Sequence, residues 1–246
     1  MEKVYRDSLN FIEAFMKEHM PHINKDMNNF PEIPKKVFCL SLEACHGMRM
    51  FCYGIKDNSI TQSYVILRQL SEQISFLWVL SEHKECFENV EKMSKLKIGL
   101  LKNDNYSIKE SNKLYKEAKK TYKLKINLND YLEYGWMLMF SDTCGVEKLY
   151  ELSGFTSMKA WRDMFNALIH NTFSFHQFYE EEQDRIIKES IYIIYTLMET
   201  YICSYHNLTG NEFKINNLDG YELFHIMYNK IINHRKQLNG ELNISD

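Results

Sequence analysis

The stretch Tyr64-Val-Ile-Leu-Arg-Gln-Leu-Ser-Glu-Gln-Ile-Ser-Phe-Leu-Trp-Val-Leu80 decides the fold class. On a helix these residues place apolar side chains on almost every side, and a helix that is apolar all round lies in the centre of a protein. The run is interrupted by Arg68, Gln69, Glu72 and Gln73, so it falls short of the roughly 18 consecutive apolar residues that a membrane span requires. We therefore predict a central buried helix, begun by Ser59 or Thr61 and ending near His83, with Leu77 and Trp78 buried.

The composition of the 246 residues favours the same class. Only three prolines and nine glycines are present, whereas strand-rich folds need many turns built from those residues. A hydrophobic fraction of 45% is ordinary for a globular protein. The prediction is a single all-α domain over residues 1–246, built as an up-and-down helical bundle.

Apolar periodicity divides the remainder of the chain into helices. Pro21, Pro31 and Pro34 should delimit a loop, because proline interrupts a helix interior. The expected helices are 2–20, 36–54, 144–153, 157–171, 179–206 and 219–238, with a short element from Trp136 to Phe140.

Six cysteines form no Cys-x-x-Cys pair, and Cys45 and Cys52 lie two turns apart on one predicted helix, too far to bridge. Buried free thiols are typical of a reducing compartment. The amino-terminal residues lack the pattern of a signal peptide, and no run of residues predicts a membrane span. The expected location is therefore the cytoplasm.

The segment from Lys92 to Lys125 contains eleven lysines against three acidic residues, although the whole chain has a net charge of −3. We predict a projecting helical hairpin, inserted over about residues 84–127 and turning at Asn103–Tyr106. One hypothesis is that this hairpin tracks RNA phosphates, with Tyr106, Tyr115 and Tyr122 stacking on bases. The alternative is a solvated charged surface. The lysines proposed to bind nucleic acid are Lys113, Lys116, Lys119, Lys120 and Lys123.

A second stretch, Trp161-Arg-Asp-Met-Phe-Asn-Ala-Leu-Ile-His-Asn-Thr-Phe-Ser174, combines an apolar helical face with Arg162, Asn166 and His170 at steps of four. Residues four apart lie on one side of a helix. Such a polar line is either a satisfied buried network or a functional site.

The central helix also contains a charged pair, Arg68 and Glu72, one turn apart. Buried ions must be paired, because a lone one costs several kcal/mol. The pair is either a structural ion pair or part of a site. If the 157–171 helix packs against this one, Arg68, Glu72, Asn166 and His170 converge.

Two Glu-x-x-His spacings, Glu43 with His46 and Glu222 with His225, match the pattern of di-iron helical bundles, and Glu13 and Glu72 would complete six ligands. A chain this rich in glutamate contains such spacings by chance, so we predict no metal. No glycine-rich phosphate loop, nucleophile elbow or zinc spacing occurs, and no cofactor is predicted.

Two segments together resemble a family. Ile66–Trp78 is similar to the Leu-Arg-x-x-x-Glu helix of a bacterial all-helical family of unknown function. Trp161 and His170 resemble its second signature, an aromatic residue followed nine positions later by histidine, and Trp136 resembles the tryptophan before it. The resemblance covers about residues 40–175 and implies a helical fold without an activity.

A looser resemblance is to HEPN domains, helical bundles with an Arg-x(4–6)-His motif, many of which cut RNA without metal across a homodimer. Asn166 and His170 match the polar residue and the histidine, whereas Phe165 stands where the family usually has arginine. Seven residues separate Arg162 from His170, so Arg68 is the other candidate for the missing cation.

Two functional classes follow. The first is an RNA-directed, HEPN-like protein of a defence or toxin type, which as an enzyme would be a metal-independent ribonuclease. In it His170 is the acid and base, Arg68 or Arg162 stabilises the phosphate, Asn166 positions the scissile group, and Glu72 belongs to the same cluster. The second is a non-catalytic helical module that recognises a protein or a small molecule.

Overall fold

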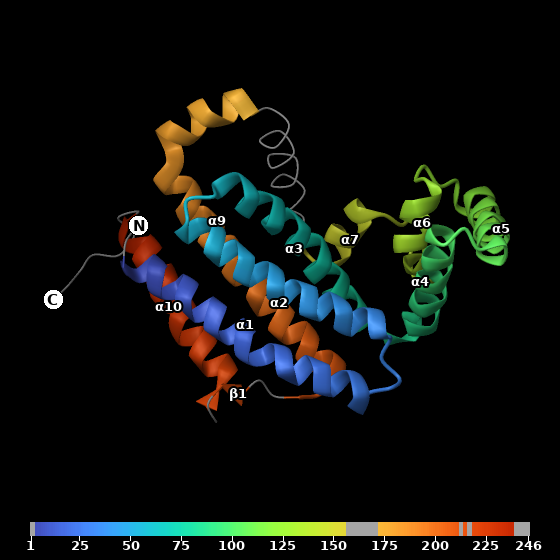
Figure 1. Cartoon of the computed structure of the whole chain (residues 1–246), viewed down its shortest axis with the longest axis horizontal. Coiled ribbons are helices and arrows are strands. Elements are labelled where there is room, and N and C mark those ends of the chain that lie inside the picture. Colours follow the sequence, from blue (N-terminus) through green and yellow to red (C-terminus); the bar gives the residue numbers. More distant parts are fainter. Residues whose placement is uncertain (1–2, 156–171, 212–213, 216–217, 239–246) are drawn as a thin grey trace.

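The computed structural model is an all-α helical bundle with a smaller group of helices at one end (Figure 1). It describes residues 3–155, 172–211, 214–215 and 218–238. We call the larger part the bundle. Its helices are α1 (Lys3–Asn29), α2 (Lys35–Lys56), α3 (Ile60–Glu82), α9 (Thr172–Thr209) and α10 (Gly220–Leu238).

Helix α3 is central, as its apolar sequence predicts. It packs against α2 on one side and α9 on another, and α7 (Val146–Leu152) lies along it. Leu77 is 1% exposed, which confirms its predicted burial, whereas Trp78 is only half-buried at the edge of the core. Val65 is 44% exposed, so one part of the helix surface remains in solvent despite the apolar sequence.

The prediction that Pro21 ends the first helix is wrong. Helix α1 continues through Pro21 to Asn29, and the additional turns bury Ile23 and Asp26. Asp26 accepts hydrogen bonds from the Tyr205 hydroxyl at 2.7 Å and from Asn211 Nδ2 at 2.9 Å. These contacts offset the loss of the one backbone hydrogen bond that a proline removes from a helix.

The predicted lysine-rich hairpin is present as α4 (Phe87–Leu101) and α5 (Asn105–Tyr122). Asp104 begins α5 by accepting a hydrogen bond from the Ser107 amide at 2.8 Å. Gly99 permits α5 to approach α4 closely, since a Cβ there would collide with the Ser107 side chain. The sequence analysis did not predict α6 (Leu128–Tyr134), a two-turn helix that packs against both α4 and α5.

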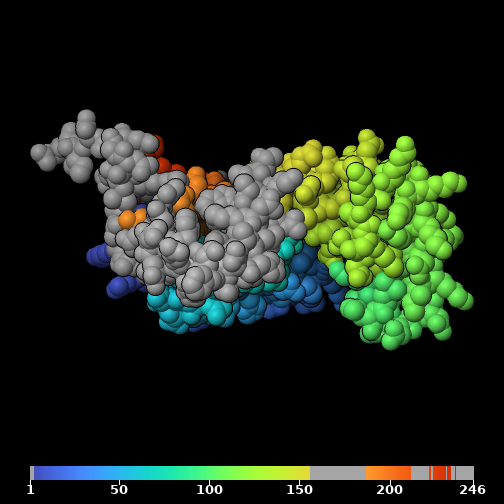
Figure 2. Space-filling model, turned by 90° about the horizontal axis from the view of Figure 1, so that it is seen from above, coloured from blue at the N-terminus to red at the C-terminus, as the bar shows by residue number. Residues whose placement is uncertain are grey.

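We call α4, α5, α6 and the 3₁₀ turn η2 (Gly135–Met139) the end lobe. The turn η1 (Lys84–Cys86) connects α3 to it, and Figure 2 shows the lobe as a separate mass at one end of the molecule. The short element predicted from Trp136 to Phe140 is confirmed as η2, and the Trp136 ring packs edge-on against Phe76 of α3.

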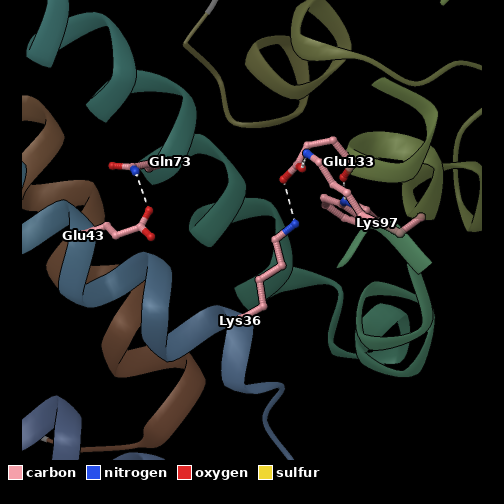
Figure 3. Close-up of polar contacts among 6 residues, drawn as sticks. Lys36, Glu43, Gln73, Lys97 and Glu133 are labelled. Carbon is pink, nitrogen blue, oxygen red and sulfur yellow. Dashed lines mark hydrogen bonds and ion pairs between the residues drawn. The ribbon is translucent and has the colours of Figure 1, made fainter. Parts of the chain in front are cut away.

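Charged side chains fasten the lobe to the bundle (Figure 3). Glu133 of α6 pairs with Lys36 of α2 at 2.7 Å and also with Lys97 of α4. Burial raises the pKa of Glu133, but the two ammonium groups outweigh it and hold this pKa below its ordinary value of 4.5. The Lys36 ammonium also lies 5.1 Å from the centre of the Phe76 ring.

The carboxyl-terminal part contains α9, two two-residue strands and α10. The antiparallel strands are β1 (Lys214–Ile215) and β2 (Leu218–Asp219). Helix α9 already begins at Thr172, several residues before its predicted start. The helix predicted over 157–171 lies outside the described residues. Among the helices that are described, none is long and apolar enough to cross a membrane.

All six cysteines are free thiols, as predicted, but only four of them are buried. Cys39 is exposed and Cys203 is half-buried. In the bundle, Cys45 lies 3.3 Å from the Tyr201 hydroxyl, to which it donates a hydrogen bond.

Candidate nucleic-acid interface and adjoining cleft

A cleft of about 750 Å³ opens between α3, α6 and α7, and we call it the Arg68 cleft. Arg68 and Glu72 line it from α3, one turn apart and both half-buried. Asp130 and Tyr134 of α6 form the opposite wall. The cleft thus lies where the bundle meets the end lobe.

Local hydrogen bonds hold these walls in place. The Tyr150 hydroxyl of α7 lies 2.8 Å from the Ser71 hydroxyl of α3, which fixes α7 against the central helix. Asn127 begins α6 by accepting a hydrogen bond from the Asp130 amide at 2.9 Å. Gly145 begins α7 with φ +132°, a conformation that L side chains rarely adopt.

Arg68 and Glu72 are not a buried structural pair. Both side chains are accessible from the cleft, and no ion pair joins Arg68 to any residue within the described ranges. The two charges therefore form no ion pair with each other among the described residues, and their place in a framework or a site with His170 stays a prediction, because His170 lies outside those residues. The geometry leaves the guanidinium of Arg68 available to an anion in the cleft.

The other charges of the cleft limit how many anions it accepts. Lys148 is the second cation, and it pairs with Glu151 at 2.8 Å. The lining carboxylates are Glu72, Asp130, Glu147 and Glu151. Four carboxylates against two cations favour at most one phosphate, at Arg68, rather than a run of them.

Burial favours the neutral forms of two other groups of the cleft, Tyr134 and Cys144. Burial, reinforced by the nearby Glu72 carboxylate, raises the pKa of the Tyr134 hydroxyl. Burial raises the pKa of the Cys144 thiol to about 11, so this sulfur is protonated near pH 7 and is a poor nucleophile. No histidine is among the described residues that line the cleft.

The residues that would supply acid–base chemistry lie outside the described residues. Arg162, Asn166 and His170 all fall within 156–171. Their convergence with Arg68 and Glu72 therefore stays a prediction.

The exposed face of α5 contains a line of cations, which we call the lysine stripe. Its members are separated by four, three and four residues, a spacing that keeps side chains on one side of a helix. All are exposed, and none forms an ion pair with another described residue. The stripe consists of Lys109, Lys113, Lys116 and Lys120.

Four of the five lysines predicted from the sequence fit this surface. Lys113, Lys116 and Lys120 lie in the stripe, and Lys123 follows it as the left-handed residue that ends α5. Lys119 points elsewhere, because its ammonium lies 5.5 Å from the centre of the Tyr115 ring. The sequence analysis missed Lys109, although the four-three-four spacing identifies it.

The three tyrosines of α5 differ in availability. Tyr115 is half-buried against Tyr131, and its hydroxyl donates to the Ile126 carbonyl at 2.7 Å, so it is not free to stack on a base. Tyr106 is 70% exposed and Tyr122 is 37% exposed, at opposite ends of the helix. Only these two remain candidates for stacking.

The lysine stripe and the Arg68 cleft lie on different parts of the end lobe. Helix α5 is at the outer end of the molecule, with α4 and α6 between it and the bundle (Figure 1). A second hollow, of about 390 Å³, is lined by Tyr122 from α5 and by Lys148 from α7. Because Lys148 lines both this hollow and the Arg68 cleft, the two cavities adjoin.

Two of the four glutamates considered as metal ligands have other partners. Glu13 accepts from Lys56 at 2.8 Å and from Tyr53 at 2.5 Å, and Glu43 accepts from Gln73 at 3.0 Å (Figure 3). Within the part of the chain that the structure describes, no three His, Cys, Asp or Glu side chains are grouped as metal ligands.

Comparisons of the chain with protein-family models, curated proteins and solved structures give no match. The resemblances to a bacterial helical family and to HEPN domains therefore stay predictions, and function is argued from the geometry alone.

Proposed function

We propose that this protein binds RNA, with the phosphate backbone running along the lysine stripe of α5. The observation that supports this most is the four exposed lysines on one side of α5, none of them neutralised by an ion pair with a described residue. Exposed, unpaired lysines attract RNA phosphates, and their binding releases the counterions that were condensed on the RNA.

The acidic residues of α5 reduce this attraction only in part. Glu110 lies toward α4, 3.9 Å from Lys92. Glu117 is exposed and borders the stripe, four residues after Lys113 and three before Lys120, so one carboxylate stands beside four lysines. The chain as a whole has a net charge of −3, so the positive surface is a local feature. A local cationic surface on an acidic protein favours specific docking of a polyanion over general adhesion to one.

The experiment measures RNA binding by fluorescence anisotropy over a range of salt concentrations. Wild-type protein should bind a labelled RNA at low salt and release it steeply as salt increases. The triple variant Lys113→Gln, Lys116→Gln and Lys120→Gln should lower the log–log salt slope by about 2, because each phosphate contact to a single strand contributes about 0.7.

The matched control removes the same charge elsewhere. Lys3 and Lys17 are exposed on α1 and Lys230 is exposed on α10, two helices of the bundle. Changing all three to Gln should leave the salt slope at its wild-type value. Equal slopes for both triple variants, or no RNA binding by the wild type at low salt, would contradict the proposal.

The proposal extends to cleavage of the bound RNA, with His170 as acid and base and with Arg68, Arg162 and Asn166 at the phosphate. The availability of Arg68 in an open cleft supports this part. Cleavage should persist in chelator, spare DNA and fall by roughly 10²-fold or more in His170→Ala. RNA that is bound but not cut between pH 6 and 9 would leave a binding protein without nuclease activity.

The second candidate is a non-catalytic module that takes a cationic small molecule or peptide in the Arg68 cleft. The surplus of carboxylates there favours it. Calorimetric titration with spermidine separates the two candidates. The second candidate would be supported if Glu72→Gln weakens spermidine binding and the lysine triple variant leaves it unchanged.

A further inference from the structure

A hollow lies beside Tyr122, at the carboxyl-terminal end of α5. From its geometry we propose that it accepts a single unstacked base carrying an exocyclic amino group, next to the end of the lysine stripe. This proposal rests on the proposed RNA binding and adds to it a sequence preference.

Two aromatic side chains, Tyr122 and Phe140, border the hollow, and most of its lining surface is polar. Tyr122 makes no ring contact or hydrogen bond with another described residue, and 37% of it is exposed. Phe140 lines the same hollow and is held in position by the His83 ring, which stacks on it. The two ring centres lie 3.8 Å apart and the ring planes are inclined by 4°. The volume of about 390 Å³ lies at the small end of the range for small-molecule sites, about 300–1,000 Å³.

The polar group of the hollow selects among bases. Asp142 lines it and is exposed, and no ion pair joins it to another described residue. A carboxylate accepts hydrogen bonds but donates none. Adenine and cytosine present amino donors to such an acceptor, whereas uracil presents a carbonyl at the corresponding position.

The position of the hollow connects the two surfaces described above. Tyr122 directly precedes Lys123, where the cationic side of α5 ends, and Lys148 is shared with the Arg68 cleft. A strand whose phosphates follow the stripe therefore reaches the hollow before the cleft. Only single-stranded RNA can turn a base into the hollow, because duplex bases are paired and stacked.

The test compares three labelled RNAs of equal length by fluorescence anisotropy: oligo(C), oligo(U) and a duplex. Wild-type protein should prefer oligo(C) to oligo(U) by roughly threefold or more. This preference is smaller than the discrimination that a bidentate base contact gives, because a single hydrogen bond is involved. Tyr122→Ala should weaken oligo(C) binding about tenfold, the effect of removing one base–aromatic stack, and leave duplex binding unchanged. Tyr122→Phe should retain the affinity, since it keeps the ring.

Two further variants separate stacking from base selection. Asp142→Ala should abolish the preference for oligo(C) while oligo(U) binding stays at its wild-type level. Tyr106→Ala removes the same side chain at the other end of α5 and should leave the ratio of the two affinities unchanged. Thermal melts of all variants identify any that fail to fold, and Tyr122→Phe controls for that outcome.

The outcomes distinguish this inference from the proposed function. RNA binding that depends on the stripe lysines, with no preference for oligo(C) and no effect of Tyr122→Ala, overturns the base site alone. Absence of RNA binding at low salt overturns both.

Discussion

The bundle and the end lobe use the same kinds of residues in opposite ways. In the bundle, large aromatic side chains such as Phe15, Tyr64 and Tyr195 are almost completely buried. In the lobe, α5 buries only Ser107, Ser111 and Ala118 and turns its lysines and two of its tyrosines toward solvent. The difference indicates that α5, unlike the helices of the bundle, presents a surface whose chemistry the fold does not require, although other parts of the lobe, such as Trp136, are fully buried.

Truncating a core side chain in each region should give the largest difference. Leu77→Ala in α3 should lower the free energy of unfolding by about 2–5 kcal/mol, because it leaves a cavity in a fully packed site. Leu114→Ala in α5 should cost less, since Leu114 is only half-buried. Urea unfolding measures both values, and equal losses would show that the lobe is packed as tightly as the bundle.

Acid should destabilise the bundle through His19. Burial, with the charge of nearby His22 as a smaller cause, lowers the pKa of His19 from 6.5 to about 3. The unfolded chain therefore binds a proton below pH 6.5 that the folded chain excludes, and stability decreases as pH falls from 6.5 toward 3.

At pH 5 this loss should amount to about 2 kcal/mol relative to pH 7, given about 1.4 kcal/mol per pH unit. Urea unfolding of wild type and His19→Gln at both pH values measures it. His22→Gln, which changes an exposed neighbour, should retain most of the pH dependence. A wild type equally stable at pH 5 and pH 7 would argue against a neutral, buried His19.

Neutralising Glu133 should loosen the contact between the two regions. Glu133→Gln should cost about 1–2 kcal/mol at pH 7, between the values for exposed and for buried ion pairs, because the three side chains are 17–37% exposed. Hydrogen exchange should increase in α4–α6 and remain slow in α3. Uniform acceleration across both regions would contradict a role at the junction.

The same variant tests the pH dependence of that contact. Because the folded pKa of Glu133 lies below 4.5, its contribution is present above that pH and disappears as pH falls through the folded value. Wild type should lose this stability below about pH 4.5, and Glu133→Gln should not.

The stripe lysines should have the smallest effect on stability. Lys113→Gln, Lys116→Gln and Lys120→Gln are surface changes, and each should alter the free energy of unfolding by less than about 0.5 kcal/mol. A thermal melt checks this. A large loss would show that the lysines serve the fold and would weaken the comparison on which the proposed interface depends.

The sequence predicted the helical class and most helix positions, because apolar periodicity and turn residues act locally. The hairpin turn at Asn103–Tyr106 and the burial of Leu77 were read in this way. The end of the first helix was not predicted correctly, since the continuation past Pro21 depends on Tyr205 and Asn211, which lie far along the chain. Helix α6 was missed because its seven residues are too few for a clear period.

For the candidate site, the sequence by itself determined which residues are charged and that α5 is basic, since composition and spacing belong to the chain. It left open whether Arg68 and Glu72 are framework or site, and whether Tyr115 is free. The tertiary structure decided the second, because the burial of Tyr115 depends on the Tyr131 ring that α6 places against it. The same dependence created the Tyr122 hollow, whose walls come from separate elements that no local pattern joins.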